Sequence, residues 1–528
     1  MKGAAILAAT VVIVKLIGAV YKIPLYNMLG DEGTSHFLVT YTIYNLLLTI
    51  STAGIPVALS RLISAAAATE RYNQVRRYYK IAMPAFAIVG AVCAIIMFVF
   101  AKQLAALMGV YEITLGVQVL APAVLFCCII SVYRGYSQGF GNMAPTAISQ
   151  IMEVVCKVII GLILAWLLVR LGYDTPVISA GAIVGVTLGL ALCIPILAVH
   201  KKKMDRVEVK QGTDVPMSKK ETLKILLKVS IPIAIGASIF NIIALVDTKI
   251  VVARLQTGAG FSYEQANILF GVYGKAQSLF SLPSAIIVPL TISIVPAIAA
   301  AIANKQSREA KTITGSSLKL TNLLAMPAGV GLFVLANPIF DVLFWNSNEN
   351  GPLLLAILGI ASFFVCLQLL TTAILQANGY EKFTVLTLPL GGILKIGLNW
   401  ILVGNPNIGI IGAPIGTLAC YVFIFLLNMV FIMWKVKDRP KFTPVFLKPA
   451  ICTLVMGAAA WASYGLFQKI GSGILGTGRM ATAVFMVAAI VVAIVVYVIL
   501  IIATHTITHD DMKYVPKGEK ISKLLRIK

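Results

Sequence analysis

The sequence predicts an all-α polytopic membrane protein. Hydrophobic residues make up 59 % of its 528 residues and charged residues only 12 %, which is about half the charged share of an ordinary soluble domain. Apolar stretches of about twenty residues recur from end to end, and a helix of that length crosses a hydrocarbon core of about 30 Å. The basic residues, in turn, gather in alternate connecting segments. These observations exclude an ordinary soluble globular domain.

Fourteen membrane spans are expected along the chain. They are residues 3–29, 37–60, 81–101, 114–133, 145–169, 178–199, 229–253, 266–302, 320–345, 352–376, 383–403, 408–434, 449–468 and 480–503. Lys15 interrupts the first apolar run and no clear cleavage site follows it, so this run predicts a membrane helix rather than a signal peptide. The eighth contains Pro283, Pro289 and Pro296 and should kink or begin as a re-entrant segment.

The basic residues predict the orientation of the chain. Of the 43 Lys and Arg residues, 32 fall in connecting segments on the side of the N-terminus, five on the opposite side and six inside spans. The positive-inside rule then places both termini and the loop 200–228 in the cytoplasm. The formal charge of +23 therefore reflects topology, and no nucleic-acid partner is expected. The basic tail 504–528 is expected to lie on anionic inner-leaflet lipid.

The two sides of the loop 200–228 share a set of residues at a nearly constant spacing. The matches are Lys22-Ile23 with Lys249-Ile250, Pro56 with Pro283, Ala82-Met83-Pro84 with Ala325-Met326-Pro327, and Gln138, Gly141 and Lys157 with Gln376, Gly379 and Lys395. They predict a duplication into two parallel six-helix lobes, residues 1–200 and 229–436, joined by a basic cytoplasmic linker, 201–228. Two extra helices in residues 437–503 stand outside the repeat.

Six lysines lie inside the predicted spans. They are Lys15, Lys22, Lys157, Lys249, Lys275 and Lys395. A lysine at mid-bilayer costs about 2.5–3.5 kcal/mol on insertion scales, so these side chains should face a water-filled cavity, pair with acids or reach the interface. Together they predict a cationic central cavity that binds an anionic cargo, for which a pyrophosphate is the natural candidate.

Some of these lysines have a second interpretation. Lys22 and Lys249 lie far enough outward for their ammonium groups to reach the outer interface. Glu153 and Lys157 are four residues apart on one helix, where they can form an ion pair. Glu153 and Asp247 are the two acids at this depth, and they are candidates for charge pairing or for ion coupling.

Two arginines lie at the predicted cytoplasmic ends of helices. Arg61 and Arg134 either anchor the chain by the positive-inside rule or form a cytoplasmic gate that meets a phosphate head group. The stretch Gly271-Val272-Tyr273-Gly274-Lys275 lacks the spacing and the Ser or Thr of a phosphate-binding loop. Neither a metal nor a cofactor is expected, while coupling to the membrane potential or to a Na⁺ or H⁺ gradient is left open.

Short motifs add a family resemblance. Gly54-Ile-Pro-Val-Ala-Leu-Ser-Arg61 and Leu282-Pro283-Ser284 running to Ile298 resemble the multidrug/oligosaccharidyl-lipid/polysaccharide (MOP) exporter superfamily. Within its polysaccharide transporter branch, the chain is similar to the SpoVB/YtgP group, relatives of the MurJ lipid II flippases. One difference is that MurJ proteins typically carry Arg-Asp in the first helix where this chain has Tyr21-Lys22. Lys15 stands at the family's earlier basic position.

The resemblance implies a fold and an activity. We expect a V-shaped, MATE- or MurJ-like pair of lobes with alternating access in a bacterial plasma membrane, and a lipid-tail groove built by the helices in 437–503. The implied cargo is an undecaprenyl-pyrophosphate-linked sugar, such as lipid II for peptidoglycan, moved from the inner to the outer leaflet. The chain is then a transporter and not an enzyme, and a monomer is expected.

Three classes of function stay open at this stage. The first is a flippase, either for lipid II or for another lipid-linked polysaccharide or spore cortex precursor. The second is a cation or multidrug antiporter, which would need carboxylates in its cavity. The third is a non-transport membrane scaffold, in which the buried lysines would have no purpose.

Overall fold

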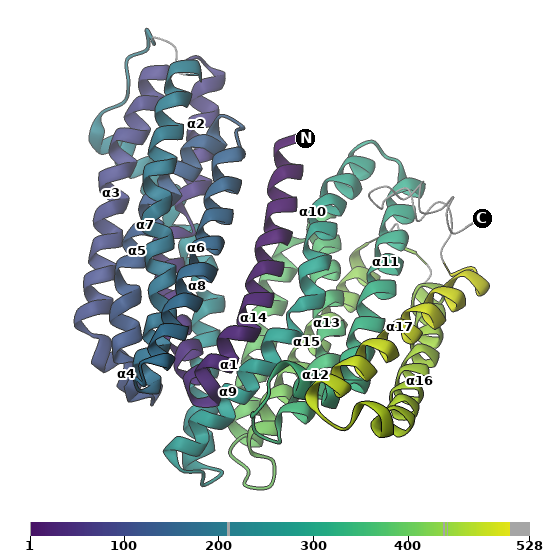
Figure 1. Cartoon of the computed structure of the whole chain (residues 1–528). Coiled ribbons are helices and arrows are strands. Elements are labelled where there is room, and N and C mark those ends of the chain that lie inside the picture. The colour runs from purple at the N-terminus through teal and green to yellow at the C-terminus, as the bar shows by residue number, and fades with distance from the viewer. Residues whose placement is uncertain (1, 209–211, 437–438, 441, 507–528) are drawn as a thin grey trace. The chain divides into compact units, whose positions relative to one another are not determined.

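The computed structural model describes residues 2–208, 212–436, 439–440 and 442–506 (Figure 1). These residues form helices and connecting turns without any strand, which confirms the all-α prediction. The chain divides into two compact units. Unit 1 contains Met1–Thr257 and Phe261–Gly271, and unit 2 contains Gly258–Gly260 and Val272–Lys528.

The helices are long enough for a multi-pass membrane protein. Among the described residues, thirteen helical stretches are long and apolar enough to cross a membrane. The first, Ala9–Ala68, has 60 residues, which at 1.5 Å per residue is about 90 Å and too long for one crossing. It breaks at Gly30, where φ is 69° and ψ is −170°, a conformation open essentially to glycine alone. Divided at this break, the thirteen stretches supply the fourteen predicted crossings.

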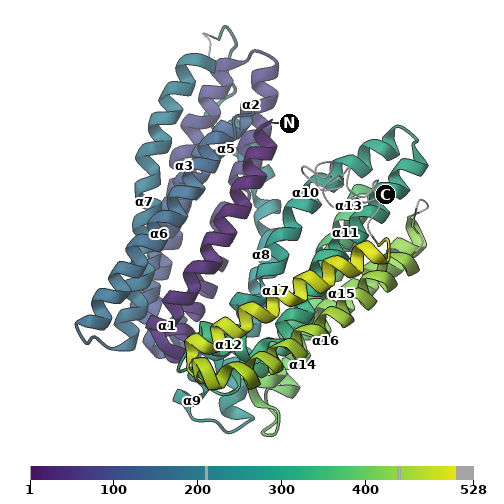
Figure 2. The same cartoon turned by 45° about the vertical axis from the view of Figure 1, so that its right-hand side comes forward.

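Unit 1 is a bundle of long helices with short connections. Its elements are α1 (Lys2–Thr52), α2 (Ile55–Ala68), α3 (Tyr72–Val99), α4 (Ala101–Met108), η1 (Tyr111–Ile113), α5 (Thr114–Gly139), α6 (Ala144–Arg170), α7 (Thr175–Glu208), α8 (Lys219–Thr257) and the first part of α9 (Tyr263–Phe280). Helices α5 and α7 pack side by side, with α3 against α5 and α6 against α7 (Figure 2).

Small residues let α6 and α7 approach closely. A Cβ added at Gly185 of α7 would lie 2.5 Å from the backbone nitrogen of Gly161 and 3.0 Å from the carbonyl oxygen of Lys157, both on α6. Such small-residue contacts replace the hydrophobic driving force that helices lack inside lipid. They fix the backbone of α6 at the position from which the Lys157 side chain projects.

Helix α8 does not follow the predicted lobe boundary. The sequence places it in the C-lobe, 229–436, whereas in the structure it packs against α1 and α3 within unit 1. Asn241 of α8 donates a hydrogen bond to the hydroxyl of Thr49 on α1 at 3.0 Å. The physical reason is that polar groups inside an apolar bundle require partners, and Thr49 provides one. As a division by sequence repeat, the two lobes stay a prediction.

The predicted linker 201–228 is more than a tether. Helix α7 continues to Glu208 and α8 begins at Lys219, so charged residues extend both helices. In the described part between them, the carboxylate of Asp214 accepts hydrogen bonds from the backbone N–H groups of Asn73 at 2.8 Å and of Gln74 at 3.0 Å. These are first-turn donors of α3 without an intrahelical acceptor, and Asp214 therefore caps that helix from a distant segment.

Unit 2 contains the remaining helices. Its elements are the second part of α9, α10 (Leu282–Ala303), α11 (Ser307–Val334), α12 (Ala336–Leu343), α13 (Gly351–Ala377), α14 (Glu381–Leu402), η2 (Gly409–Ile411), α15 (Gly412–Lys435), α16 (Phe442–Leu475) and α17 (Arg479–Ala503). The proline-rich eighth span is two helices, because α9 ends at Phe280 and α10 begins at Leu282 with Pro283 in its first turn.

Matching local structures support the predicted duplication. Pro56 and Pro283 each occupy the first turn of a helix, α2 and α10. Gly141 and Gly379 each follow a long helix with a positive φ, 76° and 77°. The short helices α4 and α12 both have eight residues. Equivalent turns at equivalent places are expected when one ancestral segment has been copied.

Candidate functional site

A buried basic site lies where α6 faces α1 in unit 1. The ammonium nitrogen of Lys157, on α6, lies 4.8 Å from the ring centroid of Tyr41 and 5.5 Å from that of Tyr21, both on α1. Each distance is within the range of a cation–π contact. The two tyrosines come from opposite sides of the break at Gly30, so this break brings both ring faces to one lysine. Tyr21 itself is 3 % exposed.

The acid predicted to neutralise Lys157 has another partner. Glu153 accepts a salt bridge from Arg134 of α5, with 3.2 Å between nitrogen and oxygen. The Nε of Arg134 also donates to the hydroxyl of Ser149 at 2.8 Å. The guanidinium donates through two nitrogens at a fixed spacing, and these reach the Ser149 hydroxyl and the Glu153 carboxylate together. The single ammonium group of Lys157, on the same helix as Glu153, cannot do this. Among the described residues Glu153 thus forms its salt bridge with Arg134, and none with Lys157, the partner that the sequence had left possible.

A second lysine lies near Lys157. Lys22 is half-buried on α1 and directly follows Tyr21, whose ring contacts Lys157. It makes no salt bridge with any residue that the structure describes. With Glu153 engaged by Arg134, the cluster keeps two positive charges on facing helices. Such an arrangement favours an anion that contacts both ammonium groups.

The other predicted lysines lie elsewhere. Lys15 on α1 and Lys249 on α8 are exposed in unit 1. In unit 2, Lys275 of α9 is 1 % exposed, with its nitrogen 5.8 Å from the ring centroid of Phe344, and Lys395 of α14 is half-buried. Within unit 1 the structure thus brings Lys22 and Lys157 together, while the cavity formed by all six lysines stays a prediction.

The remaining predicted site residues differ in their surroundings. Arg61 is exposed on α2, as a gate or an anchor requires. Arg134 is 17 % exposed and is held by Glu153, so it orders the site from within the bundle. Asp247 is buried on α8 at 7 % exposure. The roles of these residues as gate or in ion coupling stay predictions.

Sequence reasoning missed the aromatic part of the site. Nothing in the spacing of Tyr21 and Tyr41 indicates that they share a partner, because a continuous helix would separate them by about 30 Å. Gly30 was the available signal, since a glycine in an apolar helix often marks a break. Ser149 was missed because serines occur throughout the spans and few of them bind a charged group.

An apolar pocket lies beside the two C-terminal helices in unit 2. It has a volume of 350 Å³ and is lined by α11, α16 and α17. Its one residue with a polar side chain is Tyr497, whose hydroxyl donates to the carbonyl oxygen of Leu323 at 2.9 Å. The pocket adjoins the helices expected to hold a lipid tail, and its lining is almost entirely apolar.

These features define a polytopic α-helical membrane protein. Residues 1–302 match the sequence profile described as polysaccharide biosynthesis protein, which covers more than half of the chain. The chain belongs to this family.

Full-length relatives occur in Bacillus subtilis. The chain is 29 % identical to the membrane protein YabM over 99 % of this chain and 96 % of that protein. It is 25 % identical to stage V sporulation protein B, over 98 % and 97 %. It is 23 % identical to the lipid II flippase MurJ, over 93 % and 92 %. The predicted MOP-superfamily relation is confirmed.

Solved structures show the same fold. The lipid II flippase MurJ in an inward closed conformation matches with a TM-score of 0.67 at 15 % identity, over 93 % of this chain and 97 % of that one. An inward-facing MATE family transporter of the MOP superfamily matches with a TM-score of 0.60 at 16 % identity, over 80 % and 98 %. The predicted MATE- and MurJ-like fold class is therefore confirmed.

Proposed function

We propose that the chain is a flippase for an undecaprenyl-pyrophosphate-linked sugar precursor, in the first place lipid II. The observation that carries this proposal is the pair of basic side chains, Lys22 and Lys157, on facing helices of unit 1. Their neighbouring acid, Glu153, is already bound by Arg134 at 3.2 Å. Two ammonium groups without a bound carboxylate suit a pyrophosphate, which carries roughly two negative charges and accepts charge-assisted hydrogen bonds.

The relatives support the same class of cargo. The family is described by polysaccharide biosynthesis, and one relative that matches nearly the whole chain is a lipid II flippase. Sporulation protein B keeps a spore cortex precursor, or another lipid-linked polysaccharide, as the alternative cargo. Each of these lipids shares a polyprenyl tail and a phosphate-linked sugar.

Elementary energetics permit export without ATP. In the predicted orientation, with both termini cytoplasmic, a plasma membrane that is negative inside assists outward movement of an anion by about 2.3 kcal/mol per charge per 100 mV. Alternating access would then need only the membrane potential, or a coupled Na⁺ or H⁺ gradient. The apolar pocket of 350 Å³ in unit 2 would shelter part of the polyprenyl tail.

The decisive experiment measures lipid II in the outer leaflet. Cells depleted of their own flippase would express the chain, and accessibility of lipid II to an externally added lipid II-cleaving enzyme would be quantified. We expect the unsubstituted chain and Lys157→Arg to restore exposure. Lys22→Gln and Lys157→Gln should each lower it at least tenfold, because each removes one of the two charges that bind the pyrophosphate.

A matched control separates charge at the site from charge in general. Lys202 is an exposed lysine of α7, and Lys202→Gln should leave exposure unchanged at equal membrane abundance. Normal exposure in both Lys22→Gln and Lys157→Gln would overturn the site. Drug or cation export with no change in any lipid-linked sugar would overturn the flippase proposal in favour of an antiporter.

A further inference from the structure

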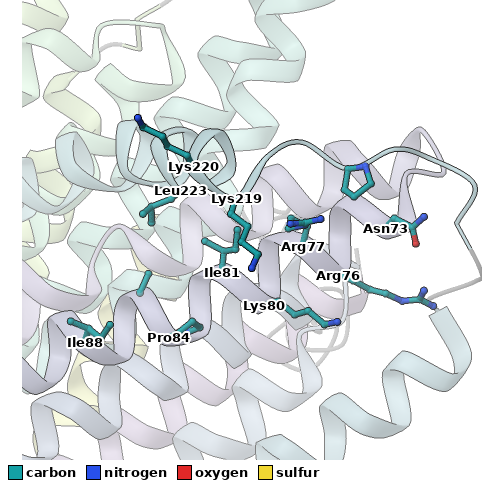
Figure 3. Close-up of a pocket in the computed structure, with 12 residues that line it drawn as sticks. Asn73, Arg76, Arg77, Lys80, Ile81, Pro84, Ile88, Lys219, Lys220 and Leu223 are labelled. Atoms are coloured by element: carbon teal, nitrogen blue, oxygen red, sulfur yellow. The ribbon is translucent and has the colours of Figure 1, made fainter.

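We infer that unit 1 carries a binding site for the head group of an anionic phospholipid between the starts of α3 and α8. A pocket of 1090 Å³ lies there, and its twelve lining residues include Arg77, Lys80 and Ile88 of α3 and Lys219, Lys220 and Leu223 of α8 (Figure 3). This site is separate from the cluster around Lys157, and the inference does not depend on the proposed flippase activity.

The pocket is strongly cationic. Five of its twelve lining residues are Lys or Arg and none is acidic. Arg77, Lys80, Lys219 and Lys220 make no salt bridge within the described part of the chain. The nearest acid along the loop, Asp214, already binds two N–H groups of α3. These four positive charges therefore make no salt bridge within the described residues, which favours a bound anion.

The lining changes from basic to apolar along each helix. On α3, Arg77 and Lys80 are followed on the same face by Pro84 and Ile88 (Figure 3), over about 16 Å of helix. On α8, Lys219 and Lys220 are followed by Leu223. Ile88 is 63 % exposed. A free phosphate makes no favourable contact with such an apolar wall. A phospholipid can contact both parts of the pocket, the basic residues with its phosphate and the apolar residues with its acyl chains.

The loop before α8 holds the two walls in place. Asn73, a lining residue, donates its side-chain N–H to the carbonyl oxygens of Gly212 and Asp214, each at 2.9 Å. The backbone N–H of Met217 donates to Gln74 at 2.7 Å. These bonds fix the start of α8, and hence Lys219, against the first turns of α3. The pocket is therefore built by specific contacts between two helices and is more than a set of mobile surface lysines.

The sequence repeat supplies a second instance. Arg308 and Lys311 of α11 stand 235 residues after Asn73 and Arg76, which is also the offset between the first residues of α3 and α11, Tyr72 and Ser307. Both line a pocket of 540 Å³ within unit 2, together with Lys319 and Lys448 and again without an acid. A basic pocket thus recurs at the start of both copies of this helix. Conservation of the feature through a duplication is expected of a site that binds something common to the whole membrane.

The occupant we assign is a phospholipid with an anionic head group, of the phosphatidylglycerol type. In the orientation predicted from the basic residues, the starts of α3 and α8 lie at the cytoplasmic surface, where anionic lipid gives a negative surface potential. Each Lys or Arg close to such a surface strengthens binding by about fivefold. Three lining cations together should then change the affinity by on the order of a hundredfold.

Native mass spectrometry of the full chain, released from nanodiscs, tests the site. The nanodiscs would contain phosphatidylglycerol and phosphatidylcholine in equal parts, and the retained lipids would be identified. We expect selective retention of phosphatidylglycerol by the unsubstituted chain. The triple variant Arg77→Gln, Lys80→Gln, Lys219→Gln should lose the share of this retention that belongs to the unit 1 pocket, while the share of the unit 2 pocket stays. The control variant Lys202→Gln, Lys203→Gln, Lys224→Gln removes three exposed cations outside the pocket and should keep it.

Two further arms identify the ligand. Ile88→Ser should weaken retention of phosphatidylglycerol, because it makes the apolar wall polar without changing charge. Soluble glycerol phosphate at the same concentration should not displace the lipid, and displacement would show a site for free phosphate instead. Equal loss in the lining and control triple variants would overturn the site, because binding would then follow net charge alone.

Discussion

Arg134 on α5 and Glu153 on α6 form a salt bridge of 3.2 Å, and this contact decides the charge of the basic site in unit 1. Glu153 lies one helical turn before Lys157, so without Arg134 it would be the nearest counter-ion for that lysine. Because the guanidinium takes the carboxylate, Lys157 rests on the rings of Tyr41 and Tyr21 instead. Because Arg134 neutralises Glu153, the positive charge of Lys157 stays available to a bound anion.

Removing one member of this pair should destabilise the chain more than removing both. In Glu153→Ala, Arg134 keeps a largely buried charge with one fewer acceptor, at a cost of about 1–3 kcal/mol. Arg134→Met combined with Glu153→Met should recover part of that cost, because no unpaired charge stays behind. The thermal midpoint in detergent measures this order, with the exposed Glu208 changed to Ala as the control. Equal midpoints for all variants would show that the pair does not contribute.

Tyr41 should matter through its ring and not its hydroxyl. Tyr41→Phe keeps the π face that lies 4.8 Å from the Lys157 nitrogen, so lipid II exposure should stay near that of the unsubstituted chain. Tyr41→Leu removes a contact of about 0.5–2 kcal/mol and should reduce exposure several-fold at equal abundance. The leaflet assay described above is the measurement. A defect in Tyr41→Phe as large as in Tyr41→Leu would assign the role to the hydroxyl.

The sequence predicted the helices well because each span must satisfy its own backbone hydrogen bonds in lipid, and an apolar run of fixed length reports this directly. It also identified Lys22, Lys157 and Glu153 as candidates, because buried charge is costly wherever it occurs. The sequence could not show which of these charged residues bind one another. Whether Glu153 binds Lys157 or Arg134 depends on how α5 packs on α6, and that packing is decided by many small contacts with no short sequence signature.

The assignment of α8 shows the same limit at a larger scale. Periodicity located this helix, but neither its composition nor its repeat partner reveals that Asn241 bonds to Thr49. The polar loop 201–228 was interpreted as a linker between two lobes, and this division stays a prediction. Its capping of α3 through Asp214 joins residues about 140 positions apart, and contacts of that range cannot be found from local pattern alone.

Gly30 should be intolerant of any side chain. Its φ of 69° and ψ of −170° lie in a backbone region whose strain costs other residues about 1–3 kcal/mol. Gly30→Ala should therefore lower the thermal midpoint and weaken the convergence of Tyr21 and Tyr41 on Lys157. Gly18 in the same helix has no positive φ and open space around an added Cβ. Gly18→Ala should therefore be neutral or slightly stabilising. Identical midpoints for the two variants would contradict the break.

Asp214 should protect the first turn of α3. Asp214→Ala removes the acceptor of the Asn73 and Gln74 N–H groups, and loss of such a cap costs about 0.5–2 kcal/mol. Hydrogen–deuterium exchange should become faster at the start of α3 and in residues 212–217, and stay unchanged around Lys157. Thr213 is exposed beside it, and Thr213→Ala should alter neither. The same loop places Lys219 beside Lys80 in the basic pocket. Asp214→Ala should therefore also reduce phosphatidylglycerol retention, while lipid II exposure is kept. Unchanged retention together with faster exchange at the start of α3 would show that the pocket forms without the cap.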